Sequence, residues 1–251
     1  MTKNIWITGA SSGIGKALAI KFTTEGWHVA ASARRENLLQ ELNNNNLNIH
    51  SFPLDVRDES QTKKVFQNII EKFKTIDIAV FCTGIHDPEA EKKLSSEKIR
   101  EIMETNFFGT VNCIMAVNEY FKERKSGHIS IVSSVAGYRG LPAASGYCAS
   151  KAALISLGES LYFDFKRHGV RVSVISPAFI KTPMTDKNKF PMPMIKSAEY
   201  AAEKMFIGLT KKNAFEIHFP LAITMLMKLL KIMPNWLYFI IASKGMKKTK
   251  L

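Results

Sequence analysis

The chain has 251 residues, of which 46% are hydrophobic and 23% are charged. This length is sufficient for one well-buried domain and short for two, and the composition excludes disorder as the main state. The formal net charge of +13 at pH 7 exceeds what solubility requires and can attract nucleic acid, anionic lipid or phosphorylated small molecules. No Cys-His finger spacing or aromatic RNA-binding signature accompanies this charge, so we expect no nucleic-acid partner.

The cysteines indicate a reducing compartment. Cys82, Cys113 and Cys148 are far apart, and each lies among apolar or small residues. This setting is typical of reduced cysteines packed in an interior rather than of a disulfide or a metal set. A strand is predicted almost from the first residues, which leaves no room for a signal peptide. We therefore expect a cytoplasmic protein without a metal site.

Strand and helix patterns alternate along the chain. Short apolar runs predict strands at Ile5–Ile7, Val29–Ala33, Ile49–Leu54, Ile78–Cys82, His128–Ser133 and Val170–Ser176. Helical spacing of apolar residues predicts helices at Lys16–Thr24, Glu36–Leu42, Glu59–Phe73, Ser96–Lys125 and Gly146–His168. This alternation predicts an α/β fold, a single doubly wound Rossmann-like domain with a parallel sheet and helices on both faces.

The end of the chain differs in composition. We expect a catalytic domain over residues 1–212 and an apolar, basic extension over 213–251, with one helix at Leu221–Met233 and another from Pro234. Every charged residue after Glu216 is a lysine, and no uninterrupted apolar stretch reaches the ~20 residues of a membrane-spanning helix. Two interpretations remain open. The helices pack on the domain or a second subunit, or they lie peripherally on an anionic membrane surface.

A glycine-rich turn joins the first predicted strand to the first helix. Gly9, Gly13 and Gly15 permit a tight turn, close approach of the backbone to a pyrophosphate and close packing of helix on strand. The N-terminus of the following helix offers free N–H groups and a positive dipole to phosphates. The spacing differs from the common G-x-G-x-x-G fingerprint, so the turn predicts a dinucleotide site of another type.

The end of the second strand bears on the choice between NAD and NADP. An acidic residue there would bond both ribose hydroxyls and repel a 2′-phosphate. The chain instead has Arg34 and Arg35 after Ala33. Arginine binds phosphate bidentately, whereas the alternative is a pair of solvated arginines at a helix start. We expect NADP(H) to be preferred over NAD(H).

Three residues have the chemistry of carbonyl reduction. Tyr147 and Lys151 are four residues apart on a predicted helix, so both side chains project from one face. An unperturbed tyrosine has a pKa of about 10, and a neighbouring ammonium favours the phenolate, so we predict that Lys151 lowers the pKa of Tyr147. Tyr147 can then act as general acid and base, while Ser134 donates a hydrogen bond to the substrate oxygen. A nicotinamide would carry the hydride.

Together with Asn106, these residues resemble the Asn-Ser-Tyr-Lys tetrad of the short-chain dehydrogenase/reductase family. The segments Thr8–Gly15, Ser133–Gly137 and Tyr147–Lys151 are close matches to its motifs, and the resemblance covers about residues 4–185. It implies that Asn106 positions a water of the proton relay and that Lys151 also holds the nicotinamide ribose.

The resemblance further implies a set of cofactor contacts. Ser11 would contact the 2′-phosphate, Asp55 and Val56 the adenine, and the loop after the sixth strand the nicotinamide carboxamide. The complete set is Gly9, Ser11, Ser12, Gly13, Ile14, Gly15, Arg34, Arg35, Asp55, Val56, Gly84, Tyr147, Lys151, Pro177, Ile180 and Thr182. The chain departs from the family at Phe81-Cys82-Thr83-Gly84, where the family has Asn-Asn-Ala-Gly, and at Ala178, which takes a glycine position.

We therefore expect an NADP(H)-dependent oxidoreductase that transfers hydride between nicotinamide and a small carbonyl or alcohol substrate. The substrate would be lipophilic if the extension binds a membrane, and residues 185–195 are expected to cover it. The alternative is a noncatalytic NADP-binding sensor or scaffold, which would have no need to keep all four tetrad residues. Members of the family commonly pair through the long helices, so a homodimer or homotetramer is expected.

Overall fold

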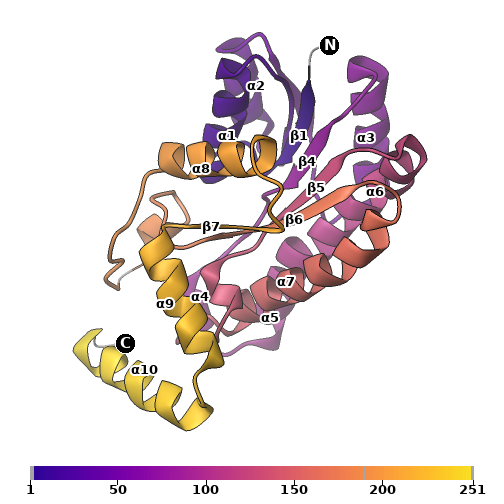
Figure 1. Cartoon of the computed structure of the whole chain (residues 1–251). Helices are drawn as coiled ribbons and strands as arrows, with labels where there is room; N and C mark the ends of the chain where they lie inside the picture. Colours follow the sequence, from indigo (N-terminus) through magenta and orange to yellow (C-terminus); the bar gives the residue numbers. More distant parts are fainter. Residues whose placement is uncertain (1–2, 189, 250–251) are drawn as a thin grey trace.

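Seven parallel strands form one sheet in the order β3-β2-β1-β4-β5-β6-β7 (Figure 1). The computed structural model describes residues 3–188 and 190–249. The strands are β1 (Asn4–Thr8), β2 (His28–Ala33), β3 (Ile49–Pro53), β4 (Ile78–Phe81), β5 (His128–Val132), β6 (Arg171–Pro177) and β7 (Glu216–Phe219). The strand order reverses direction between β1 and β4, which is where doubly wound sheets bind their ligands.

Helices cover both faces of this sheet. On one face lie α1 (Gly13–Thr24), α2 (Glu36–Asn44) and α8 (Ala198–Thr210), and on the other α3 (Glu59–Phe73), α6 (Gly109–Arg124) and α7 (Ser145–Lys166) (Figure 1). Successive strand residues point to opposite faces, so Ile5 and Ile7 join the core under α1 whereas Trp6 joins the core under α3. The doubly wound fold predicted from the sequence is confirmed.

The segment predicted as one helix over Ser96–Lys125 is helical from Ser96 to Arg124, but a π turn interrupts it. The chain forms α5 (Ser96–Met103), then one turn of π-helix at Glu104–Phe108, then α6. In this turn Asn106 is fully buried and bonds the backbone of the β4 loop, while a Cβ on Gly109 would lie 2.5 Å from Val56 Cγ2. The π turn thus lies where the helix contacts the β4 loop and Val56, and π turns are frequent at functional sites.

Among the α-helices and strands of the described residues, three were not predicted. They are α4 (Pro88–Glu91), α8 and β7. Strand β7 pairs with β6 although it lies beyond residue 212, where we expected the extension to begin.

The extension beyond β7 consists of α9 (Leu221–Ile232) and α10 (Asn235–Thr249). Thr224 and Met227 of α9 are buried, and Tyr238 of α10 is only 5% exposed. The Tyr238 ring lies 4.4 Å from the Arg139 guanidinium, and its hydroxyl donates to Gly140 O. Both helices thus pack on the domain by their inner faces, and they project from its lower left in Figure 1.

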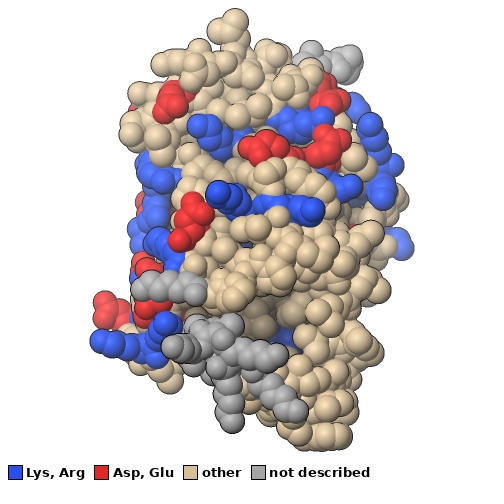
Figure 2. Space-filling model, turned by 90° about the vertical axis from the view of Figure 1, so that its left-hand side faces the viewer, with Lys and Arg blue, Asp and Glu red and all other residues tan. Residues whose placement is uncertain are grey.

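The outer faces of α9 and α10 expose large apolar side chains. These are Leu221, Met225, Leu226, Leu229, Ile232, Trp236, Phe239, Ile240 and Ile241. Figure 2 shows this side of the molecule, with charged side chains dense across its upper half and sparse at its lower right. Within the described part of the chain, no helix has the length and apolar character needed to cross a bilayer.

Candidate active site

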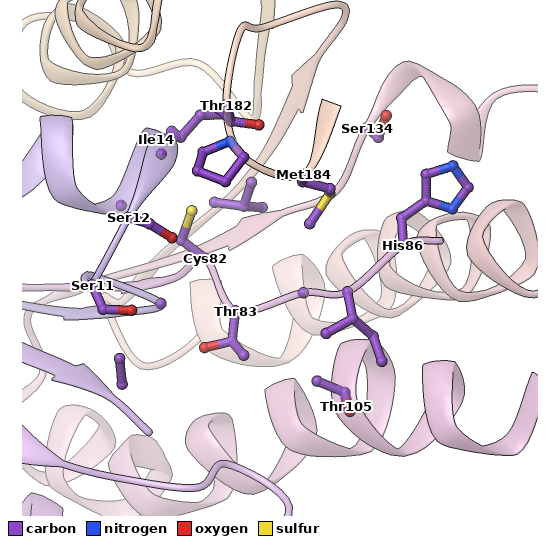
Figure 3. Close-up of a pocket in the computed structure, with 18 of the residues that line it drawn as sticks. Ser11, Ser12, Ile14, Cys82, Thr83, His86, Thr105, Ser134, Thr182 and Met184 are labelled. Carbon is purple, nitrogen blue, oxygen red and sulfur yellow. The ribbon is translucent and has the colours of Figure 1, made fainter. Parts of the chain in front are cut away.

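One pocket of about 660 Å³ lies where β1, β2, β4, β5 and β6 end. All sixteen cofactor contacts expected from the sequence line it, as does Ser134; of the expected site residues, Asn106 alone does not. In Figure 3, Ser11 and Ser12 lie at one side, His86 and Ser134 at the other, and Cys82, Thr83 and Met184 between them. The fold therefore brings the glycine-rich turn and most of the tetrad into one cavity.

The glycine-rich turn is as tight as its residues predict. Gly9 has φ +69°, and a Cβ there would lie 2.9 Å from Cys82 O. A Cβ on Gly15 would lie 2.3 Å from Gly9 O, because α1 begins directly above the end of β1. The Ser12 side chain at the N-cap makes no hydrogen bond to the first turn of α1, so the backbone N–H groups there are free to bind phosphate oxygens.

Arg35 crosses from the start of α2 to this turn. Its Nη2 lies 2.9 Å from Ser11 Oγ and 2.6 Å from Ser12 Oγ, and its Nε lies 3.2 Å from Ser11 Oγ. Arg34 is exposed at the rim of the pocket. Asp55 is paired with Arg57 at 2.6 Å, and this hydrogen bond holds the pKa of the Asp55 carboxyl below its ordinary value. Of the two neighbouring arginines, Arg35 is the one whose guanidinium is hydrogen-bonded to Ser11.

The catalytic candidates come from β5, the turn after it and α7. Lys151 is 4% exposed, its Nζ donates to Val132 O at 2.9 Å, and Nζ lies 5.7 Å from the centroid of the Tyr147 ring. Ser134 Oγ donates to Pro177 O at 3.4 Å and accepts from Ala136 N at 3.1 Å. Ser133 Oγ donates to Lys151 O at 2.7 Å and so ties β5 to α7.

Burial decides the protonation of this pair. It raises the pKa of Tyr147 to about 12, although the hydrogen bond from Ser134 acts in the opposite direction. It also lowers the pKa of Lys151 to about 8. We predicted that Lys151 lowers the pKa of Tyr147. In this structure the pKa of Tyr147 is instead raised, because burial disfavours the phenolate.

Asn106 holds the loop after β4. Its Oδ1 accepts from Ile85 N at 2.7 Å, and its Nδ2 donates to Ile85 O and to Ser150 Oγ, both at 3.0 Å. A Cβ on Gly84 would lie 3.4 Å from both Asn106 Oδ1 and Lys151 Nζ. The asparagine therefore joins the β4 loop to α7 beside Lys151.

Although the chain departs from the family motif after β4, a hydrogen bond still links β4 to β1 at that point. Cys82 N donates to Thr8 Oγ1 at 3.1 Å, which links β4 to β1. The loop after β6 closes the same region, since a Cβ on Gly13 would lie 3.1 Å from Thr182 Cγ2. Met184, Thr185 and Lys187 also line the pocket, and the last two belong to the segment 185–195 that we expect to cover the substrate.

Two functional candidates were missed by the sequence analysis. The His86 ring stacks on Tyr147 with 4.4 Å between centroids, and His86 Nδ1 lies 2.8 Å from Oε1 of the buried Glu91. Both follow β4 outside any motif that we quoted, so sequence spacing gave no signal for them.

The lining of the pocket suits a dinucleotide. Its glycines leave backbone open where a Cβ would clash, and an arginine faces the turn that would hold phosphate. Among the described residues, no group of three or more His, Cys, Asp or Glu side chains could hold a metal ion.

Comparison with known proteins identifies the family. Residues 3–193 match the family model described as short chain dehydrogenase. The chain is 35% identical over 236 residues to an uncharacterized oxidoreductase of Myxococcus xanthus, covering 92% of this chain and 93% of that protein. It is 34% identical over 185 residues to the 3-oxoacyl-(acyl-carrier-protein) reductase FabG of Thermotoga maritima, covering 72% and 75%.

Solved structures agree with this result. ElxO with NADP bound superposes with a TM-score of 0.77 at 25% identity, covering 87% of this chain and 98% of that one. The closed form of serine dehydrogenase complexed with NADP+ gives a TM-score of 0.79 at 25% identity, covering 87% and 95%. On the sequence motifs, the fold and these comparisons, the chain belongs to the short-chain dehydrogenase family and is an oxidoreductase of that family.

Proposed function

We propose that this protein is an NADP(H)-dependent oxidoreductase that transfers hydride between nicotinamide and a carbonyl or alcohol substrate. One observation carries the proposal: a single pocket joins the glycine-rich turn and Arg35 at one end to Ser134, Tyr147 and Lys151 at the other. A noncatalytic sensor would need only the first end.

The protein residues have separable roles in carbonyl reduction. The nicotinamide supplies the hydride when bound. Tyr147, protonated at neutral pH, donates its proton to the substrate oxygen, and Ser134 donates a hydrogen bond to that oxygen as negative charge develops. Lys151 would hold the nicotinamide ribose and stabilise the phenolate left on Tyr147. Asn106 keeps the β4 loop beside Lys151 and, by resemblance, positions a relay water.

The preference for NADP(H) rests on two kinds of support. Arg35 contacts the Ser11 and Ser12 hydroxyls, and no acidic residue ends β2. Similar solved structures carry NADP or NADPH in their names. Bidentate binding of a 2′-phosphate by Arg35 would favour NADP(H) over NAD(H).

Oxidation of NADPH, followed by its absorbance, tests the function. A panel of ketones, aldehydes and a 3-oxoacyl thioester is offered to wild type, Tyr147→Phe and Ser134→Ala. We expect turnover by wild type, a loss on the order of 10²–10⁴-fold in Tyr147→Phe, and a smaller loss in Ser134→Ala. Binding of NADPH without turnover of any carbonyl would instead favour the sensor alternative.

We also propose that the protein is a homodimer or homotetramer that pairs through α6 and α7. Phe108, Met115 and Phe163 are large, exposed and apolar, and they lie on or beside these helices. Isolated exposed apolar residues are ordinary, but a pairing surface would cover these three. Light scattering should give a dimer or tetramer for wild type and a smaller species for Phe163→Glu.

The outer faces of α9 and α10 are proposed to lie on an anionic membrane surface of a cytoplasmic compartment. Nine exposed apolar side chains would enter the interface, and the net charge of +13 would attract anionic headgroups. Helix α9 also packs through Met227 against the cluster containing Val135 and Ala178, and Ala178 lines the pocket. A lipophilic substrate would fit this arrangement.

Flotation with anionic and neutral liposomes tests the membrane proposal on the full chain. Leu229→Glu and Trp236→Glu place charge on exposed positions, and Leu47→Glu, at a residue 90% exposed elsewhere, is the matched control. We expect wild type and the control to float with anionic liposomes only, and the two extension variants to remain soluble. Soluble behaviour of wild type would contradict the proposal.

A further inference from the structure

A buried carboxylate lies beside the catalytic tyrosine. The Glu91 side chain is 1% exposed. Its Oε2 accepts from Gly146 N at 2.8 Å and from Tyr147 N at 3.2 Å, and its Oε1 lies 2.8 Å from His86 Nδ1. Burial of a carboxylate is costly unless hydrogen bonds compensate it, and here three donors and the positive end of the α7 dipole do so.

Glu91 thereby fixes the residue Tyr147 at two points. It binds the backbone of Tyr147 in the first turn of α7, and it binds the imidazole that stacks on the phenol ring at 4.4 Å with 30° between the planes. Because an ionised carboxylate can only accept, Nδ1 of His86 carries the proton toward Glu91. The ring of His86 therefore has a defined orientation against the phenol.

The backbone of His86 is also held. It follows Ile85, whose N–H and C=O both bond the buried Asn106 side chain. A continuous chain of contacts runs from the π-helical turn through the β4 loop and His86 to Tyr147. Its members come from three elements far apart in sequence, and each contact restrains the next.

We propose that the Glu91–His86 pair is a positioning element that holds the Tyr147 phenol at the substrate end of the pocket. The inference rests on the proposed function, since it assigns a role in hydride transfer. Geometry gives the reason: a general acid must lie within hydrogen-bond reach of the substrate oxygen, and small misplacements lower kcat steeply. His86 restrains the face of the phenol ring, and Lys151 Nζ lies 5.7 Å from the ring centroid.

Single-turnover oxidation of bound NADPH by a carbonyl substrate tests this role. His86→Ala should lower the rate on the order of 10-fold, since aromatic pairing of about 0.5–1.5 kcal/mol corresponds to about 2–13-fold and misplacement adds to it. The affinity for NADPH should stay within about twofold. His86→Phe keeps a ring and should recover a substantial part of the loss. His50→Ala, which removes an imidazole packed on Phe73 away from the pocket, is the matched control.

The Glu91→Gln substitution distinguishes positioning of Tyr147 through His86 from a general loss of fold stability. If Glu91 acts through His86, its substitution should cost more rate in the His86 background than in the His86→Phe background, as a double-mutant cycle measures. Equal costs in both backgrounds, or an unchanged rate in His86→Ala, would overturn the proposal.

A measurement without turnover keeps this result distinct from failure of the proposed function. The Cζ resonance of Tyr147 in ¹³C-tyrosine-labelled protein, assigned with Tyr147→Phe, should shift in His86→Ala and not in His50→Ala. If wild type turns over no carbonyl, the proposed function fails. If this resonance is unmoved in His86→Ala, positioning by His86 fails whatever the activity.

Discussion

Replacing Arg35 by alanine should weaken NADPH binding selectively. Nη2 of Arg35 lies 2.9 Å from Ser11 Oγ and 2.6 Å from Ser12 Oγ, so the guanidinium already faces the turn expected to hold the 2′-phosphate. Hydrogen bonds to charged groups contribute about 1.5–3 kcal/mol each. Arg35 is exposed, so we discount a bidentate pair to roughly 2 kcal/mol in total. At 1.4 kcal/mol per tenfold change, the Kd for NADPH should rise about 30-fold.

Titration of nicotinamide fluorescence measures this loss. NADPH and NADH are titrated into wild type, Arg35→Ala and the matched variant Arg34→Ala, at low and at high salt. Arg35→Ala should leave NADH affinity nearly unchanged and should reduce the salt dependence of NADPH binding. Equal weakening of both cofactors in Arg35→Ala, or selective loss of NADPH in Arg34→Ala instead, would refute the reasoning.

Two further predictions concern the turn and the pH dependence. Gly15→Ala should destabilise the fold by about 1–3 kcal/mol, because the added Cβ would lie 2.3 Å from Gly9 O. Its melting temperature should be roughly 2–12 °C lower than that of wild type. Gly140→Ala is the control and should melt like wild type, because its Cβ would meet nothing within 4 Å. The kcat/KM for reduction should fall as pH rises through about 8. Burial lowers the pKa of Lys151 to about 8, so its ammonium is lost in this range. Tyr147 keeps its proton there, because burial raises its pKa to about 12. A pH–rate profile that stays flat to pH 10 would contradict this sign.

Much of the fold could be predicted because the sheet is buried on both faces. Apolar runs such as Ile78–Phe81 have little alternative to a parallel strand, and the helix predicted at Glu59–Phe73 has those bounds in the structure. The glycine-rich turn was predictable for a local reason, since Gly9 and Gly15 stand where a Cβ would meet backbone. The pocket at the ends of the strands follows from parallel topology.

The remaining features depend on contacts between distant segments. In the π turn at Glu104–Phe108 Asn106 bonds Ile85, and Gly109 directly after it packs on Val56, contacts that the local sequence pattern does not reveal. The sequence does not tell which of the adjacent Arg34 and Arg35 contacts the glycine-rich turn. The backbone at the start of α2 directs Arg35 toward Ser11. Strand β7 is only four residues long, and pairing with β6 rather than its own pattern makes it a strand.

The protonation of the site shows the same dependence on tertiary structure. Tyrosine and lysine four residues apart predict mutual stabilisation of phenolate and ammonium, yet both side chains are removed from water, and burial disfavours each charged form. The pKa of Tyr147 therefore rises while that of Lys151 falls. A phenol that stays protonated is the acid required for carbonyl reduction, whereas alcohol oxidation would need the phenolate. Under the proposed function we therefore expect the free protein to favour reduction at neutral pH, and groups that hold the neutral phenol in place, such as His86, to matter most in that direction.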